Sequence, residues 1–415
     1  MDTKELRSWL RLILTPSVGN DTARRLLSQL GSVEAIFEAS EWSLSELVTP
    51  AQVQSLCQPP ALLEAHYVRT TQWLSAPSPA NHATRAIWPL GHPLYPASLL
   101  HLADPPLLLF VEGQTQRTLG PAIAVVGSRN PTPQGRQTAQ QLSRALADAG
   151  LCVVSGMALG IDGASHQGAL QSMTTAHAKV APALCTKDKT GADTLASLET
   201  SRTSAYWKTV GVVGTGLDHI YPRHHQALAQ EIGAHGLLIS EYLLGTPPLA
   251  ANFPQRNRLI AALGLGTLVV EAAMRSGSLI TARMALDIGR EVFAVPGSIH
   301  AMQSHGCHWL IRQGAKLVET AQDVLEELRC QHPALQFSED STVEGADAVT
   351  FSPDTTTASH PVLEHMGFTP ISLDALQVHC GLDTPNLQAT LLRLELQGTV
   401  ARLPGGLFQR LGPVT

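Results

Sequence analysis

AIAVVGS at residues 122–128 is the first of six short apolar stretches that decide the fold of this 415-residue chain. The others are LCVVSG (151–156), TVGVVGTG (209–216), GLLISEY (236–242), GTLVVEAA (266–273) and EVFAVPGS (291–298). Each is rich in β-branched residues and is followed by a segment with helical periodicity. Near-continuous apolar strands that alternate with helices indicate a mostly parallel sheet with helices on both faces. The sequence therefore predicts a Rossmann-like α/β domain.

The regions around these strands divide the chain into four parts. We predict a helical module of the helix-hairpin-helix or SAM-like type (1–75), the Rossmann-like domain (76–330), an acidic flexible linker (331–360) and a winged-helix domain (361–415). Residues 75–120 are rich in proline and are expected to form loops, apart from the strand LLLFVEG (107–113). The polar stretch at about 172–207 is longer than compact α/β connections require, so it is expected to be a surface insertion.

The function of the two flanking modules stays open at this stage. The N-terminal helices contain Arg24 and Arg25, and their turn suits either a DNA phosphate or plain packing. In the winged helix, Arg393 is the single basic residue of the second helix and Glu395 stands beside it. DNA contact and protein contact are therefore both open for this domain.

Composition excludes several classes of protein. Apolar residues make up 44% and charged residues 15% of the chain, which excludes a mainly disordered protein. The apolar runs are too short to cross a bilayer and the N-terminus lacks a signal-peptide pattern, so we expect a soluble, cytoplasmic protein without a membrane span. The tightest metal-like cluster, His305, Cys307 and His308, lacks a second ligand pair, so no metal and no cofactor are expected.

Glycine, serine and arginine follow the strands at the edge where open α/β sheets bind ligands. Bare glycine backbone, helix N-termini such as the one after Thr132, and planar guanidinium groups all favour anions. No dinucleotide fingerprint and no P-loop is present. The predicted binding residues are Gly127, Ser128, Arg129, Gly156, Gly160, Gly216, Arg223, Arg256, Asn257, Arg258, Arg275, Gly277 and Ser278.

These motifs carry a family resemblance over roughly residues 80–330. In order, GSR, SGMALGIDGASHQGAL, TGLDHIYP, ISEY, FPQRNRLIAAL, VVEAAMRSGSLITA, VPGSIH and HGCHWLIRQGA resemble the DNA-processing protein A (DprA/Smf) family. The helical module and the winged helix resemble accessory domains of that family. The sequence departs from the family in the insertion and in His308, where asparagine is expected.

The resemblance implies a function that the residues alone do not establish. It implies a non-catalytic protein that binds single-stranded DNA, protects incoming DNA and loads the RecA recombinase in natural transformation and homologous recombination. It also implies a homodimer and a contact with single-strand-binding protein. The GSR motif is Gly127, Ser128 and Arg129 in this chain.

Three alternatives belong to other classes. A nucleoside-monophosphate phosphoribohydrolase of the lysine-decarboxylase-like group would use Glu271, but the Pro-Gly-Gly that should precede Gly264 is absent. Asp162 and His166 could share a proton on one helix face, yet no nucleophile or metal accompanies them, which favours packing. A pure interaction scaffold centred on the winged helix would leave the row of arginine-bearing loops without a role.

Overall fold

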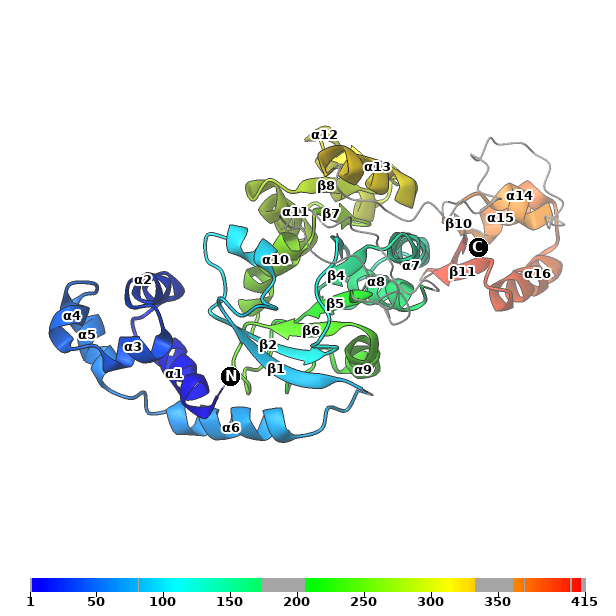
Figure 1. Cartoon of the computed structure of the whole chain (residues 1–415). Coiled ribbons are helices and arrows are strands. Elements are labelled where there is room, and N and C mark those ends of the chain that lie inside the picture. The colour runs from blue at the N-terminus through cyan, green and yellow to red at the C-terminus, as the bar shows by residue number, and fades with distance from the viewer. Residues whose placement is uncertain are drawn as a thin grey trace, which may run out of the picture.

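The computed structural model describes residues 2–80, 82–172, 206–332, 361–368, 370–403 and 405–411. Nearly all of the predicted insertion (173–205) and of the predicted linker (333–360) lies outside the described residues. Figure 1 shows the N-terminal helices, the sheet domain and the C-terminal domain following one another along the chain.

The centre of the molecule is a nine-stranded sheet. The seven strands that lie in the order β6-β5-β4-β3-β7-β8-β9 are parallel to one another. At the other end of the sheet, β2 runs antiparallel to β6, and β1 runs antiparallel to β2. All six predicted strands are present, so the Rossmann-like prediction is confirmed. In spatial order the strands are β1 (Thr84–Pro89), β2 (Leu108–Gly113), β6 (Leu237–Ser240), β5 (Thr209–Val212), β4 (Cys152–Ser155), β3 (Ala122–Val126), β7 (Gly266–Val269), β8 (Glu291–Ala294) and β9 (Lys316–Leu317).

Strand β1 corrects the expectation that residues 75–120 form loops apart from LLLFVEG. It pairs along its whole length with β2, and Trp88 in it is 1% exposed. The proline-rich flanks obscured this strand because proline is tolerated at strand ends and edges. The 3-10 helix η1 (Ala97–His101) follows it and packs against helix α10 (Asn252–Leu263).

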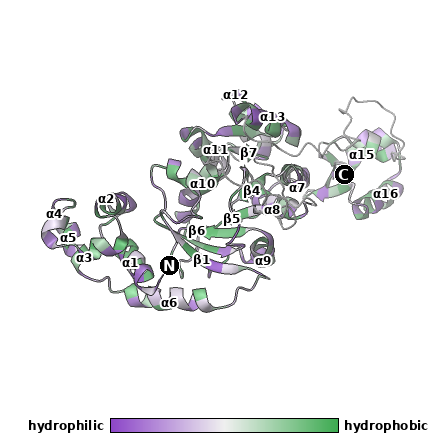
Figure 2. Ribbon diagram, in the orientation of Figure 1, coloured by the Kyte–Doolittle hydropathy of each residue, from purple (hydrophilic) through white to green (hydrophobic). Residues whose placement is uncertain are grey.

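Helices cover both faces of the sheet because side chains alternate along each strand. In β3, Ile123 and Val125 face one side, and Ala122, Ala124 and Val126 face the other. The first side is covered by α7 (Pro133–Asp148), α8 (Ile161–Leu170) and α13 (Ala321–Gln331), with α9 (Gln226–His235) beside α8. The second side is covered by α10 (Asn252–Leu263), α11 (Gly277–Asp287) and α12 (His305–Arg312). Figure 2 shows the resulting hydrophobic strands between helices of mixed polarity.

The N-terminal helices share one apolar core with the β1–β2 end of the sheet. Trp73 in the last of these helices lies edge-on to Phe110 of β2, with ring centroids 6.3 Å apart. Arg24 donates to the Asp104 carboxylate at 2.7 Å and to the Ala103 carbonyl at 3.0 Å. These contacts favour a packing role for Arg24, the first residue of the Arg24–Arg25 pair. The helices are α1 (Thr3–Leu14), α2 (Asn20–Leu30), α3 (Val33–Glu38), α4 (Glu41–Ser45), α5 (Pro50–Cys57) and α6 (Leu63–Ser75).

The C-terminal domain has the predicted winged-helix fold. Gly381 with a φ of 67° ends its second helix, and Gly398 with a φ of 70° follows the third. The preceding helix α14 was not predicted. In order, the elements are α14 (Pro361–Met366), β10 (Ile371–Ser372), α15 (Leu373–Cys380), α16 (Thr384–Leu396), β11 (Val400–Leu403) and β12 (Leu407–Arg410). Within the described residues, no helix combines the length and the hydropathy needed to span a membrane.

The Asp162–His166 pair is part of the packing of α8 against the sheet. His166 is fully buried, and its Nδ1 lies 2.7 Å from Oγ1 of Thr209 in β5. Burial, followed by the charges of His225 and Arg256, lowers the pKa of His166 to about 3. The imidazole is therefore neutral in the folded protein at physiological pH.

His166 should make stability depend on pH. Because its pKa is lower in the folded chain than the ordinary 6.5, the unfolded chain binds one more proton between these values, and stability falls as pH falls. This contributes a loss of about 2 kcal/mol between roughly pH 7.5 and 5. Urea unfolding of His166→Gln across this range should show a shallower slope. The exposed His224→Gln is the matched control for loss of an imidazole, and an unchanged slope in His166→Gln would contradict the assignment.

Candidate nucleic-acid interface

The topology places a crevice between β3 and β7. The two strands are parallel neighbours, but the chain leaves β3 toward α7 on one face and leaves β7 toward α11 on the other. Such a switch point is where open α/β sheets bind ligands, outside the carboxyl ends of the strands. A pocket of about 500 Å³ opens there, which we call the crevice pocket.

The crevice pocket collects most of the predicted binding residues. They come from the turn after β3, from α10, from the turn before α11 and from the first residues of α11. Those that line it are Gly127, Ser128, Arg129, Arg256, Asn257, Arg275, Gly277 and Ser278. Gly156 and Gly160 lie directly behind this lining. The sequence motifs thus converge on one site.

The turn after β3 is fixed by close backbone contacts. Gly160 has a φ of 84°, and a side chain there would overlap the carbonyl oxygen of Ser128. That carbonyl accepts a hydrogen bond from the Ile161 amide at 3.1 Å, and Oγ of Ser128 accepts one from the Asn130 amide at 3.1 Å. The fixed turn presents the exposed Arg129 side chain at the mouth of the crevice pocket.

Arg256 is a buried brace and not a solvent-facing contact. It is 3% exposed, and its Nη1 donates to the carbonyl oxygens of Gly156, at 2.6 Å, and of Val212. Burial lowers its pKa to about 10, so it stays charged at neutral pH. Burial raises the pKa of the nearby Asp162 carboxyl, and the positive charge of Arg256 opposes that shift. A side chain on Gly156 would overlap both groups.

The N-terminus of α7 already holds an internal anion. The Glu271 carboxylate accepts hydrogen bonds from the Thr132 amide at 2.9 Å and from its hydroxyl at 2.6 Å. This corrects the expectation that the helix start after Thr132 attracts an external anion. It also assigns Glu271 a structural partner. Burial raises the pKa of Glu271, and the two bonds from Thr132 oppose that shift.

Three predicted residues lie apart from the crevice pocket. Arg258 pairs with the Glu241 carboxylate and donates to the Asp104 carbonyl at 2.8 Å, which ties α10 to the segment that also holds Arg24. Burial raises the pKa of Glu241 to about 6. Gly216 lies against the backbone of Gly245, and Arg223 lines a second pocket.

Two aromatic residues at the site were missed from the sequence. Phe253 lines the crevice pocket, and the Arg129 guanidinium lies 5.7 Å from its ring centroid. Tyr221 is 48% exposed, and its ring centroid lies 5.6 Å from that of Phe253. Both residues precede a proline, Tyr221 in HIYPRHH and Phe253 in NFPQRNR, and the prediction from these motifs rested on their basic residues alone.

The exposed charge at this edge of the molecule is positive. Arg129, Arg223 and Arg275 are exposed, and none of them forms an ion pair with another described residue. Of the nearby acidic groups, Asp162 is buried behind the lining, and the exposed Asp218, in the segment before Arg223, accepts a hydrogen bond from the Gly245 amide at 2.8 Å. Guanidinium groups without an ion pair beside the Tyr221–Phe253 aromatic pair suit a polyanion that carries planar bases.

The candidate metal ligands each have a partner in the protein. The Cys307 thiol is buried and donates to the carbonyl oxygen of Val269 at 3.6 Å. His308 Nε2 lies 3.0 Å from the Gly297 carbonyl oxygen, and His305 Nε2 lies 3.0 Å from that of Ile299. These side chains therefore organise the start of α12.

Known proteins are similar to this chain over most of its length. The family model of DNA recombination-mediator protein A matches residues 86–187 and 189–329, and the model of the DprA winged helix domain matches residues 347–406. Protein Smf of Escherichia coli is 37% identical over 338 residues, which cover 80% of this chain and 78% of that protein. DNA processing protein DprA of Streptococcus pneumoniae is 42% identical over 233 residues, or 56% of this chain and 71% of the relative.

A solved structure agrees with these similarities. The X-ray structure of DNA processing protein A from Streptococcus pneumoniae superimposes with a TM-score of 0.57 at 32% identity. The superposition covers 81% of this chain and 99% of the Streptococcus pneumoniae chain. The family match spans more than half of the sequence and includes every motif at the crevice, so the chain belongs to the DNA recombination-mediator protein A (DprA/Smf) family.

Proposed function

We propose that the crevice pocket binds single-stranded DNA. The observation that carries the proposal is the row formed by Arg129, Phe253 and Tyr221 at the mouth of the crevice. Guanidinium groups bind phosphates, and aromatic faces stack on bases without regard to sequence. Stacking requires bases that are not paired in a duplex, and a pocket of about 500 Å³ admits unpaired nucleotides better than a rigid double helix.

The proposed role is binding and not chemistry. In the alternative phosphoribohydrolase, Glu271 would be a reacting group, but both of its oxygens accept hydrogen bonds from Thr132. Asp162 is buried against Arg256, and His166 is neutral and packed against β5. These placements favour structural roles for the acidic residues around the crevice.

We infer further that the bound strand is delivered to the RecA recombinase. Family membership supports this inference, together with a site that holds a strand mainly through backbone charge and stacking. Protection of incoming DNA in natural transformation, homologous recombination, contact with single-strand-binding protein, a homodimer and a cytoplasmic location belong to the same proposal. Strand binding is its first testable part.

Arg129→Ala should weaken single-strand binding by about 1–3 kcal/mol, because it removes a phosphate contact and the cation beside Phe253. The salt dependence of binding should also flatten by roughly 0.7 per lost phosphate contact. Fluorescence anisotropy with a labelled oligonucleotide at several salt concentrations measures both. Arg25→Ala, which removes an exposed arginine of α2, is the control. Unchanged affinity in folded Arg129→Ala would contradict the site.

The winged helix should contribute little to this binding. Its helix α16 carries a single arginine, Arg393, with Glu395 close by. The winged-helix domain contacts the sheet domain through Gln409 of β12, which donates a hydrogen bond to Gln134 at 2.9 Å. Gln134 does not line the crevice pocket. A chain shortened after residue 332 should therefore bind single strands within about threefold of the full chain and form the same oligomer. Side-by-side affinity and mass measurements test this, and a tenfold loss would place the winged helix in the main site.

A further inference from the structure

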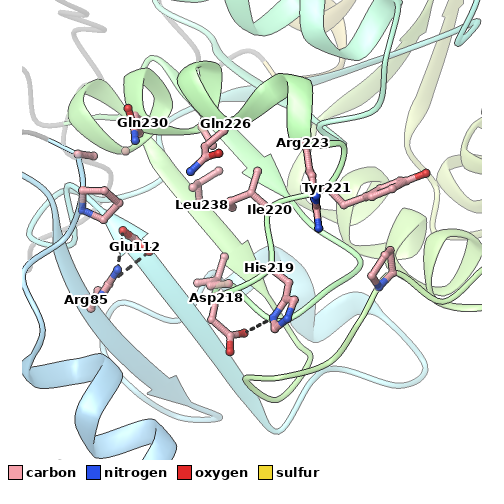
Figure 3. Close-up of a pocket in the computed structure, with 16 residues that line it drawn as sticks. Arg85, Glu112, Asp218, His219, Ile220, Tyr221, Arg223, Gln226, Gln230 and Leu238 are labelled. Atoms are coloured by element: carbon pink, nitrogen blue, oxygen red, sulfur yellow. Dashed lines mark hydrogen bonds and ion pairs between the residues drawn. The ribbon is translucent and has the colours of Figure 1, made fainter.

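A second pocket opens beside the crevice pocket. It has a volume of about 590 Å³ and lies between β1 and β2, helix α9, and the segment 217–223 that follows β5. We call it the side pocket. Figure 3 shows Arg85 and Glu112 at one end of it and Tyr221 and Arg223 at the other. Its volume is within the range of about 300–1,000 Å³ of sites that hold small molecules.

The charged groups at the Arg85 end of the side pocket are bound to each other and to the protein. Arg85 donates through Nη1 to the Trp73 carbonyl at 3.1 Å and through Nη2 to the Glu112 carboxylate at 3.4 Å, and that carboxylate also accepts a hydrogen bond from Ser78 at 2.6 Å. The Asp218 carboxylate accepts a hydrogen bond from the Gly245 amide at 2.8 Å, and Nδ1 of His219 lies 3.2 Å from the same carboxylate oxygen. These carboxylates are therefore occupied by groups of the protein and form a fixed polar wall.

The remaining polar groups of the side pocket are unpaired. Arg223, Gln226 and Gln230 are exposed, and their side chains have no hydrogen-bond or ion-pair partner among the described residues. A guanidinium group binds a phosphate, and a side-chain amide can both donate to and accept from the edge of a base. One cation and two amides within one cavity match the chemistry of a nucleotide.

The side pocket is connected to the crevice pocket through an aromatic pair. Tyr221 lines the side pocket and Phe253 lines the crevice pocket. Their ring centroids are 5.6 Å apart and their planes are inclined by 44°. A strand that stacks on Phe253 from the crevice therefore meets Tyr221 next, and beyond Tyr221 the cavity and Arg223 follow.

We propose that the side pocket is a second nucleotide subsite for the same DNA strand. The nucleotide beyond the Phe253–Tyr221 pair places its phosphate against Arg223 and the edge of its base against Gln226 and Gln230. The proposal rests on the proposed binding of single strands in the crevice. It predicts that affinity rises when an oligonucleotide is long enough to fill both pockets.

The test fills the side pocket and leaves the crevice unchanged. Gln230→Trp places an indole in the side pocket from α9, and Ala227→Trp, at an exposed position of the same helix that does not line the pocket, is the matched control. Affinities are measured by anisotropy for oligo(dT) of about 4 to 16 nucleotides, the range of site sizes on single-strand binding folds. Gln226→Trp repeats the test from a second position.

Wild type and Ala227→Trp should gain about tenfold in affinity at the length that reaches the side pocket, the gain typical of one stacked, contacted base. Gln230→Trp and Gln226→Trp should bind the shortest oligonucleotides normally and lack that gain. Identical length profiles in all four proteins would overturn the subsite while leaving crevice binding intact. Weakened binding of the shortest oligonucleotides in Arg129→Ala, with normal binding of them in the tryptophan variants, shows that the crevice works independently of the side pocket.

Free nucleotide provides the second measurement. Thymidine monophosphate is titrated against wild type alone and against wild type bound to the shortest oligonucleotide. Weak binding that Gln230→Trp removes, and that the short oligonucleotide strengthens, supports a subsite of one continuous track. Tight binding of the free nucleotide without any effect of DNA would overturn the proposal, because the side pocket would then serve a separate small molecule.

Discussion

The buried guanidinium of Arg256 is the interaction on which the crevice depends. It donates to the carbonyl oxygen of Gly156, which directly follows β4, and to that of Val212, the last residue of β5. It also lies beside the Asp162 carboxyl. Removing a charge from water costs several kcal/mol unless its hydrogen bonds are made inside the protein. Because the partners are backbone carbonyls at two strand ends, that requirement fixes the positions of both loops relative to α10.

The fixed loops divide the arginines into two kinds. Arg256 and Arg258 are both bound to groups of the protein itself: Nη1 of Arg256 donates to two carbonyl oxygens, and Arg258 contacts Glu241 and Asp104. Arg129 and Arg275 stand at the surface of the crevice without an ion pair among the described residues, so their charge is available to a ligand. The inner arginines set the geometry, and the outer arginines supply the charge.

The sequence predicted the sheet because buried parallel strands are written as short β-branched runs, and it located the site because glycine and arginine follow those runs. It could not separate Arg256 from Arg258. Residues two apart on a helix point in different directions, and the sequence does not say which of them faces the sheet. It also missed the carboxylate of Glu271 at Thr132, because this contact joins residues 139 positions apart. The aromatic residues Tyr221 and Phe253 did not stand out, because a single aromatic residue before a proline is equally typical of a packed turn.

The topology of the sheet also sets the direction in which a DNA strand can cross the proposed site. The crevice opens at the ends of β3 and β7, whereas Tyr221 and Arg223 follow β5, two strands away from β3. Neighbouring strands are about 4.8 Å apart, so this offset is roughly 10 Å, a distance that only a few nucleotides span. Phe253 at the start of α10 lies between the two groups and contacts both Arg129 and Tyr221. In the proposed binding mode the DNA strand runs across the carboxyl edge of the sheet, and α10, which Arg256 holds in place, sets the spacing between Arg129 and Tyr221.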